Sequence, residues 1–281
     1  MKPNLVVLTD FSLAAERARA YAAALAAPLQ AEVHLVHVYY PQAVPLDFGT
    51  TLPVPYTRYV QETRQSLEIL AAEMPQPATA EVLETTWQDA VEQALKRYQP
   101  LALLAGLTAT DSLLDEWMSN RALPLAHSTG YPLLLIPEHL PTAALHPPRR
   151  IALAIKDASF HLEPQTRAIA PLLDSLGTEV IPVCVLPYEE RFGGWRGRQA
   201  AQQCGLSGAI PRCGLHKVIR ELPASGILQG VDEVEADVVA LLDQGHGWLH
   251  KIFYGSVTEH ILRHTQVPVL LLAAHLESSA D

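Results

Sequence analysis

The most constraining feature of the sequence is a repeat: a short apolar run followed by a helical segment occurs at the start of the chain and again near its middle. The segments Asn4–Thr9 and Ile151–Ile155 each have the length of one strand and show no polar alternation. Such runs are typical of strands buried on both faces of a parallel sheet. The first is followed by the Ala-rich segment Leu13–Ala27, with Ser12 as its N-cap, and the second by a helical stretch that ends at Gly177.

Strands and helices continue to alternate through both halves. Further helices are predicted at Thr57–Glu73 and Gln88–Tyr98. Further strands are predicted at Glu32–Val38, Ala80–Leu83, Leu101–Ala105, Leu133–Ile136, Val180–Val185, Lys217–Leu222, Val238–Leu242 and Val269–Leu272. Strands separated by helices require right-handed crossovers, which place helices on both faces of a parallel sheet. The sequence therefore predicts an α/β fold of two tandem Rossmann-like domains, 1–140 and 149–281, with the Pro-rich connection His139–Arg150 between them.

Two segments lack clear periodicity. Tyr40–Pro55 is a Pro-bearing insert, and Pro187–Gly214 is Gly-rich and only weakly helical. We expect irregular loops at both places, and loops of this length often contact partners.

The charge balance argues against a nucleic-acid partner. The chain has 30 acidic and 20 basic residues, a formal net charge of −10. A protein that binds duplex nucleic acid instead needs clustered Lys and Arg to contact the phosphates. One group of basic residues, Arg191, Arg196 and Arg198, lies in a Gly-rich segment beside Glu189 and Glu190. We interpret that segment as a solvated loop.

Composition predicts a cytoplasmic protein without membrane association. Hydrophobic residues make up 49% and charged residues 18% of the chain, enough for a buried core. No run approaches the roughly 18 apolar residues that a membrane span requires, and the first residues show no signal-peptide pattern. The three cysteines, Cys184, Cys204 and Cys213, are too few for a disulfide framework and fit a reducing compartment.

A glycine-bearing segment after the strand Val238–Leu242 has the features of a phosphate site. Ligands of open parallel sheets bind beyond the carboxyl ends of the strands. Ser256 and Glu259 have the spacing of a capping box, which marks a helix start whose free amides attract anions. Gly245 and Gly255 would let backbone amides approach a phosphate. The same residues also suit an ordinary turn and helix cap, so both interpretations stay open.

Four pieces of the sequence together resemble the universal stress protein family. These pieces are Leu8–Ser12, Leu35–Val38, Gly255–Glu259 and Val267–Leu270. The resemblance covers nearly the whole chain as two fused copies. It implies domains with an open five-stranded parallel sheet that pair through their last strands and, in one branch, bind ATP through a Gly-x2-Gly-x9-Gly-Ser/Thr loop. Leu133–Ile136 and Val269–Leu272 would then pair antiparallel, so that one chain forms a pseudo-dimer and covers two sheet edges.

In the second half, the resemblance matches the phosphate end of the ATP motif. It implies as nucleotide-binding residues Gly245, Gly255, Ser256, Val257 and Val185. Leu242 stands in place of the first glycine. Lys156 stands in place of the acid that contacts the nucleoside, with Asp157 one position late. The ammonium of Lys156 could instead reach a phosphate.

In the first half, the resemblance matches the nucleoside end. It implies as nucleotide-binding residues Thr9, Asp10, Val38 and Gly106. Ala109 takes the place of the second glycine, and Ser119–Asn120 takes the place of the closing pair. The Cβ atoms of Ala109 and Ser119, which glycine lacks, would stand where the backbone must contact a phosphate.

Other chemical signals in the sequence are weak. His260 and His264 have the spacing of two metal ligands on a helix, but no third ligand stands nearby in the sequence. We therefore predict no metal site, and no nucleophile motif indicates a catalytic residue. Trp195 is expected to pack in the core, since no basic groove accompanies it.

Three functions remain open from the sequence. The resemblance implies a stress-response signalling module, regulated by ATP or another adenine nucleotide, with or without Mg²⁺, that acts through an unidentified protein partner and as a homo-oligomer. A slow ATP hydrolase or phosphotransferase would need positioned cations, for which Lys156 and Lys251 are available but no P-loop lysine motif. A ligand-free scaffold is the third.

Overall fold

The computed structural model describes residues 2–39, 56–108, 129–206, 208, 210, 214–243 and 257–276. The first half consists of β1 (Asn4–Leu8), α1 (Leu13–Leu29), β2 (Glu32–Val38), α2 (Tyr56–Ala72), β3 (Ala78–Leu83), α3 (Trp87–Tyr98), β4 (Ala102–Leu107) and β5 (Leu133–Pro137). The second half consists of β6 (Arg150–Ile155), β7 (Phe160–Leu162), α6 (Ala170–Leu176), β8 (Glu179–Leu186), α7 (Trp195–Gln203), β9 (His216–Ile219), α8 (Pro223–Glu233), β10 (Val238–Asp243), α10 (Val257–His264) and β11 (Val269–Leu276).

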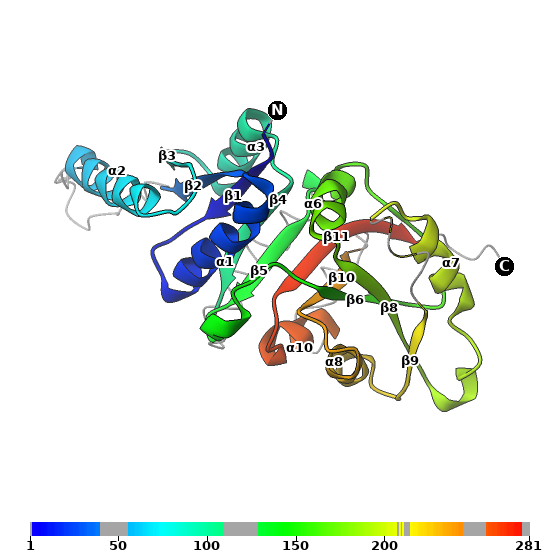
Figure 1. The fold of residues 1–281 in the computed structure, drawn as a ribbon. Coiled ribbons are helices and arrows are strands. Elements are labelled where there is room, and N and C mark those ends of the chain that lie inside the picture. Colours follow the sequence, from blue (N-terminus) through cyan, green and yellow to red (C-terminus); the bar gives the residue numbers. More distant parts are fainter. Residues whose placement is uncertain are drawn as a thin grey trace, which may run out of the picture.

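The strands form one continuous sheet with the order β3-β2-β1-β4-β5-β11-β10-β6-β8-β9. Within each half the neighbouring strands of this path are parallel, and the two halves repeat the same order. Only β5 and β11, side by side at the centre of Figure 1, are antiparallel neighbours in the path, with Leu134 opposite Leu270. This arrangement confirms the two five-stranded parallel sheets and the pairing of their last strands.

Both faces of the sheet are covered, which explains the unbroken apolar runs. On β1, Leu5 and Val7 belong to the core layer that also contains α1, α2, α6 and α7. Val6 and Leu8 belong to the opposite layer, which contains α3, α8 and α10. Successive residues of each strand point into opposite core layers. A strand covered on both sides therefore has no face left for polar residues.

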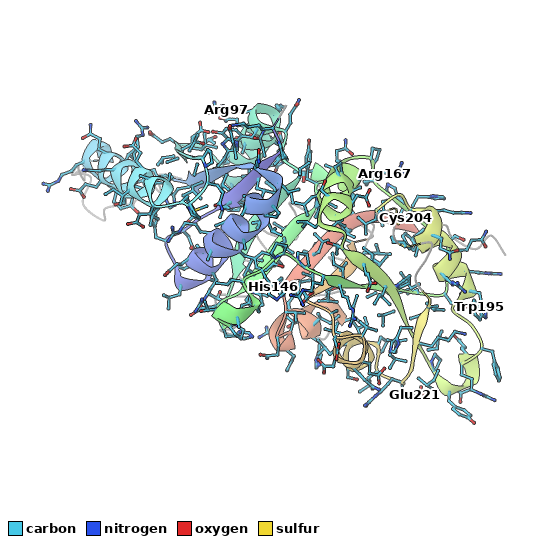
Figure 2. The ribbon with its side chains drawn as sticks, in the orientation of Figure 1. Arg97, His146, Arg167, Trp195, Cys204 and Glu221 are labelled. Atoms are coloured by element: carbon cyan, nitrogen blue, oxygen red, sulfur yellow. The ribbon has the colours of Figure 1, made fainter. Side chains whose placement is uncertain are left out.

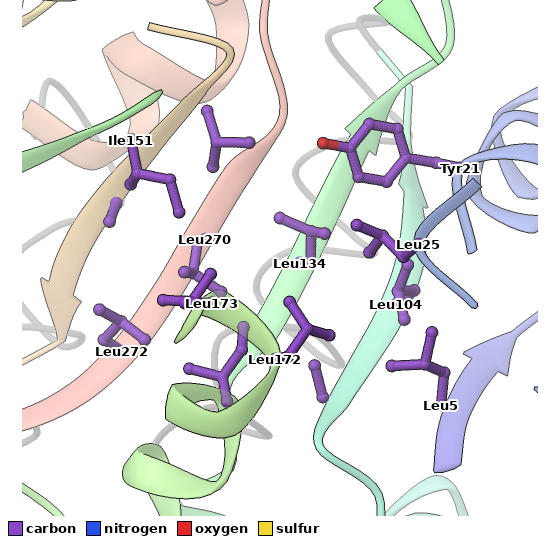
Figure 3. Close-up of a cluster of buried hydrophobic side chains, with 14 of the residues drawn as sticks. Leu5, Tyr21, Leu25, Leu104, Leu134, Ile151, Leu172, Leu173, Leu270 and Leu272 are labelled. Atoms are coloured by element: carbon purple, nitrogen blue, oxygen red, sulfur yellow. The ribbon is translucent and has the colours of Figure 1, made fainter. Parts of the chain in front are cut away.

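Apolar side chains from the two halves meet over the central strands (Figure 3). Leu134 and Leu270 are buried on β5 and β11, and Leu172 and Leu173 of α6 pack in the same cluster. Tyr21 of α1 also lies in this cluster, 1% exposed, and its hydroxyl has no hydrogen-bond partner among the described residues. The junction is therefore part of the hydrophobic core.

The helix ends follow the local sequence signals. The side chain of Ser12 accepts a hydrogen bond from the Ala15 amide at 3.2 Å, which confirms Ser12 as the N-cap of α1. Gly177 ends α6 in the left-handed conformation, with φ of 65°. Thr86 caps α3 in the same way as Ser12 caps α1.

The segment after β6 is only partly the helical stretch that the sequence predicts. It forms the short strand β7, then a 3-10 turn at Gln165–Ile169, and only then the seven-residue helix α6. Strand β7 pairs antiparallel with the far part of β11, with Phe160 opposite Leu276. A long β11 thus supplies an edge for this segment, a contact between distant parts of the chain that local patterns do not report.

Within the Gly-rich segment Pro187–Gly214, residues Trp195–Gln203 form the regular helix α7, which the sequence does not predict. Gly197 of α7 lies directly against β6: an added Cβ there would stand 2.0 Å from the carbonyl oxygen of Lys156. Ala200 and Ala201 are buried on the same helix. Tertiary contact therefore stabilises a helix of weak propensity. Trp195, expected in the core, is 56% exposed.

Strand β9 ends at Ile219, earlier than the predicted Leu222, because α8 begins at Pro223. Proline suits the first position of a helix and keeps the preceding residue extended. Leu222 accordingly has φ of −99° and ψ of 105° as the N-cap. No helix in the described part of the chain is long and apolar enough to cross a bilayer.

Candidate functional site

A crevice of about 550 Å³ lies in the second half, at the carboxyl ends of three neighbouring strands. β6 contributes Ala154 and Ile155, β8 contributes Val185 and Leu186, and β10 contributes Leu241 and Leu242. Residues from β7, the connections and the helices complete its lining: Lys156, Asp157, Ala158, Phe160, Glu190, Pro223, Ile227, Val257 and Thr258. Its volume falls within the range of about 300 to 1,000 Å³ that is usual for small-molecule sites.

One wall of the crevice is the first turn of α10. Val257 begins this helix, and Thr258 is 3% exposed. Ser256, which would complete the capping box with Glu259, precedes the first described residue of this helix, so the capping box stays a prediction. Glu259 accepts a hydrogen bond from the Arg263 side chain at 3.1 Å, one turn further along. Gly245, Gly255 and Ser256 themselves lie outside the described residues, so their place in the site stays a prediction.

The polar end of β6 is held by α7. The Asp157 carboxylate accepts a hydrogen bond from the backbone amide of Arg196 at 2.9 Å. This carboxylate fixes the start of α7 against the crevice, in the manner of a helix cap. Lys156, in contrast, is exposed at the same edge and lines the crevice. Asp157 thus has a structural partner at the start of α7.

Cys184 lies on β8 close to this edge and is fully buried. Burial, and to a lesser degree the neighbouring Asp157 carboxylate, raises the pKa of the Cys184 thiol to about 11. The thiol is therefore protonated at neutral pH, and a protonated thiol is a poor nucleophile.

In the first half, the sheet register brings the ends of three strands together. Leu8 pairs with Val36 of β2 and with Ala105 of β4. The candidate residues that follow these positions are Thr9, Asp10, Val38 and Gly106. The fold therefore places them at one edge of the sheet, with the Thr9 carbonyl oxygen 2.8 Å from Nδ1 of His37.

Two of these first-half residues have structural roles. Asp10 accepts a hydrogen bond from the Ser12 amide at 3.0 Å and so shapes the turn into α1. Gly106 lies under α1: an added Cβ would stand 2.3 Å from the backbone carbon of Ala14. Helix packing thus accounts for this glycine. The motif's later positions, Ala109 and Ser119–Asn120, lie outside the described residues.

A smaller cavity of about 190 Å³ in the first half lies between α1 and α2. Thr9, Ser12 and Leu70 are among its lining residues, together with Glu16 and Arg19. The crevice of the second half instead reaches α8 and α10, on the other side of the sheet. Among the described residues, these two cavities thus lie against different helices.

Sequence reasoning missed the wall of the crevice that α8 supplies. Pro223 and Ile227 of this helix line the crevice. The Leu222-Pro223 step was the available signal, since proline favours the first position of a helix. Glu190 was also missed, because its segment was interpreted as an irregular loop.

The histidine pair on α10 forms a contact within the helix. The rings of His260 and His264 stack with their centres 4.1 Å apart, and His264 Nδ1 lies 2.8 Å from the His260 carbonyl oxygen. Within the described ranges, no group of three or more His, Cys, Asp or Glu side chains is placed to hold a metal ion.

Comparison with known proteins agrees with this architecture. The model of the family described as "Universal stress protein family" matches residues 1–114 and 195–273, more than half of the chain. None of the curated proteins searched matches the sequence. The class defined by the repeated fold is thus a tandem α/β protein with a crevice at the carboxyl ends of its strands. The chain belongs to the universal stress protein family.

Two solved structures with TM-scores above 0.5 show the same fold at low identity. A universal stress protein from Archaeoglobus fulgidus DSM 4304 is similar over 97% of this chain and 97% of its own, with 14% identity and a TM-score of 0.65. The functionally unknown protein PA1789 from Pseudomonas aeruginosa PAO1 is similar over 96% of this chain and 92% of its own, with 14% identity and a TM-score of 0.51. A family member from Arabidopsis thaliana with AMP bound aligns with 50% of this chain and 97% of its own, at 14% identity and a TM-score of 0.29.

Proposed function

We propose that this universal stress protein is a nucleotide-regulated binding module in which the crevice of the second half holds an adenine nucleotide. The single observation that carries the proposal is the coincidence, in one crevice of about 550 Å³, of strand ends and a helix start. Ligands of open parallel sheets bind at this position. The same proposal includes a protein partner that this module binds and the assembly of the chain into a homo-oligomer.

The lining of the crevice suits the parts of such a ligand. Val185, Leu241 and Ile227 offer apolar surface for a flat base. The first turn of α10 offers backbone amides and the positive end of the helix dipole to a phosphate. Lys156 adds a positive charge at the rim. The site therefore has an apolar part and an anion-binding part within reach of each other.

Calorimetry and thermal melting with ATP, ADP, AMP and GTP, with and without Mg²⁺, test this proposal. A ligand that binds only the folded chain stabilises it by about 2.7 kcal/mol at one hundred times its Kd. We expect adenine nucleotides to raise the melting temperature more than GTP does. No shift with any nucleotide would instead support a ligand-free scaffold, and steady release of phosphate from ATP would support a hydrolase.

Matched variants assign the site to one half. Gly255→Glu places a carboxylate where the phosphate would lie, and we expect it to abolish the shift. Ser119→Glu is the corresponding change in the first half and should leave the shift intact. Lys156→Glu reverses an exposed charge at the crevice and should weaken binding of ATP more than binding of adenosine. If Ser119→Glu alone abolishes the shift in melting temperature, the nucleotide binds in the first half instead.

A further inference from the structure

Exposed apolar side chains gather at the end of the sheet where β9 is the last strand. They are Tyr188, Phe192, Trp195, Ile219 and Leu222, of which Phe192 is 75% and Leu222 70% exposed. Trp195 is labelled at this end of the molecule in Figure 2, far from β3. Contiguous exposed apolar surface of this kind often marks an interaction site. We name these five residues, together with Arg191, Arg198 and Lys217, the β9 patch.

Contacts join six residues of the β9 patch: Tyr188, Arg191, Phe192, Trp195, Arg198 and Lys217. Lys217 reaches from β9 to α7: its Nζ lies 4.3 Å from the centre of the Trp195 ring and donates to the Phe192 carbonyl oxygen at 3.4 Å. The guanidinium carbon of Arg191 lies 4.4 Å from the Tyr188 ring centre and 4.5 Å from that of Phe192. Residues from the β8–α7 connection, α7 and β9 are therefore in direct contact.

The β9 patch lies in a basic part of an acidic chain. Residues 188–222 contain six Arg and Lys and three Glu, a net charge of +3. Since the whole chain carries −10, the other residues carry −13. The local charge is thus opposite in sign to that of the rest of the molecule, and it favours an anionic partner.

The cations of the β9 patch already lie over its aromatic rings. Bases of single-stranded nucleic acids bind by stacking on such ring faces. Here Arg191 lies over Tyr188 and Phe192, and both Arg198 and Lys217 lie over Trp195. A guanidinium held over a ring keeps planar N–H donors at its edge, where a carboxylate can accept two of them. This arrangement favours carboxylates over bases.

The position of β9 adds a backbone feature. It is the last strand in the sheet order and, among the described strands, pairs only with β8. An extended peptide can pair with the outer edge of such a strand. Lys217 and Ile219 lie two residues apart on the same face of β9 and would offer a cationic and an apolar contact to side chains of that peptide.

We propose that the β9 patch docks an acidic, extended segment of a partner protein. The carboxylates of that segment bind Arg191, Arg198 and Lys217, and its apolar side chains pack on Phe192 and the other exposed residues of the patch. The proposal is independent of nucleotide binding, because it rests on contacts outside the crevice.

Fluorescence anisotropy on the full chain with three dye-labelled probes tests the proposal. The probes are a short peptide in which glutamate alternates with leucine, the same peptide with lysine in place of glutamate, and a single-stranded oligouridylate. We expect the glutamate peptide alone to bind, and its affinity to fall as salt is added. Failure of the glutamate peptide to bind, or tighter binding of the oligouridylate, overturns the proposal.

Matched variants locate the binding surface. Arg191→Glu and Phe192→Ser should each weaken binding of the glutamate peptide about tenfold or more, as expected for central contacts of an interface. Arg64→Glu and Ile69→Ser make the same changes at exposed positions of α2 and should leave binding unchanged. Equal losses in both pairs overturn the proposal. A dimer of the unmodified chain that Arg191→Glu dissociates, seen by light scattering, would assign the patch to a second copy and also overturn it.

Discussion

Gly106 shows how a residue of a ligand motif can have a packing role. Because an added Cβ would meet the backbone of Ala14 at 2.3 Å, Gly106→Ala forces α1 away from β4. We expect a loss of about 1 to 3 kcal/mol in the free energy of unfolding, as for other overpacked sites. Urea denaturation measures this loss.

Gly214→Ala is the matched control for this change. No heavy atom lies within 4 Å of a Cβ added at Gly214, so stability should stay the same or rise slightly. Equal stability of Gly106→Ala and Gly214→Ala would contradict the packing explanation and leave ligand contact as the reason for the glycine at position 106.

Tyr21 carries a buried hydroxyl without a partner among the described residues. A buried polar group that makes no hydrogen bond costs about 1 to 3 kcal/mol. We therefore expect Tyr21→Phe to keep or increase the free energy of unfolding. Tyr98→Phe is the control: the Tyr98 hydroxyl donates to Glu81 at 2.7 Å, so its removal should cost about 0.5 to 1.5 kcal/mol. A clear loss in Tyr21→Phe would show that the hydroxyl has a partner, such as a buried water.

Burial of Tyr21 also predicts alkaline sensitivity. Burial, followed by the charge of Asp237, raises the pKa of the Tyr21 hydroxyl above its ordinary value. The folded state therefore holds this proton more tightly than the unfolded chain, whose tyrosines titrate near about pH 10. Stability from this group is present below that pH and declines as the pH rises above it. Unfolding curves from neutral to strongly alkaline pH should show a smaller decline for Tyr21→Phe; an identical decline would contradict this assignment.

At the scale of the elements, a carboxylate from the end of β6 holds the start of α7. Asp157 accepts from the Arg196 amide at the start of this helix, and loss of such a cap costs about 1 kcal/mol. We expect Asp157→Ala to accelerate hydrogen exchange of the α7 amides. Asp10→Ala removes the matching carboxylate of the first half, which bonds Ser12, and should leave α7 unaffected. Unchanged exchange in Asp157→Ala would mean that packing of Ala200 and Ala201 alone holds the helix.

The elements that sequence reasoning identified are those with a strong local signal. The unbroken runs of β1, β5, β6, β10 and β11 are recognisable because both faces of each strand are buried. Ser12 and Gly177 gave the ends of α1 and α6, because capping depends on only a few neighbouring residues. α7 and β7 were missed, since the first depends on close contact between Gly197 and β6 and the second on the far end of β11.

At the scale of the whole molecule, the central pairing covers two sheet edges. Leu133, Leu134 and Leu135 of β5 lie opposite β11, and without β11 they would form an exposed apolar edge. We expect a fragment of residues 1–140 to associate into dimers or larger species through β5, whereas the full chain keeps this edge covered. Light scattering after size exclusion measures the difference.

The control for the fragment is Leu134→Lys, because a lysine on an edge strand opposes strand pairing. If the Leu134→Lys fragment still associates, the association does not depend on β5. A monomeric unmodified fragment would also contradict this role of β5. Residues 1–140 and 149–281 remain predicted domain boundaries, and the same experiment shows whether the first of them is stable in isolation.

The sequence by itself determined the repeat, the strand runs and the helix caps, because these depend on residues close together in the chain. It also indicated the last strand of each half, because an apolar strand must be covered by other parts of the protein. Only the tertiary structure decided that Asp157 holds α7, that Gly106 packs under α1, and that α8 lines the crevice. These contacts join residues from different elements, and their distances follow from the packing of the whole sheet rather than from any local pattern.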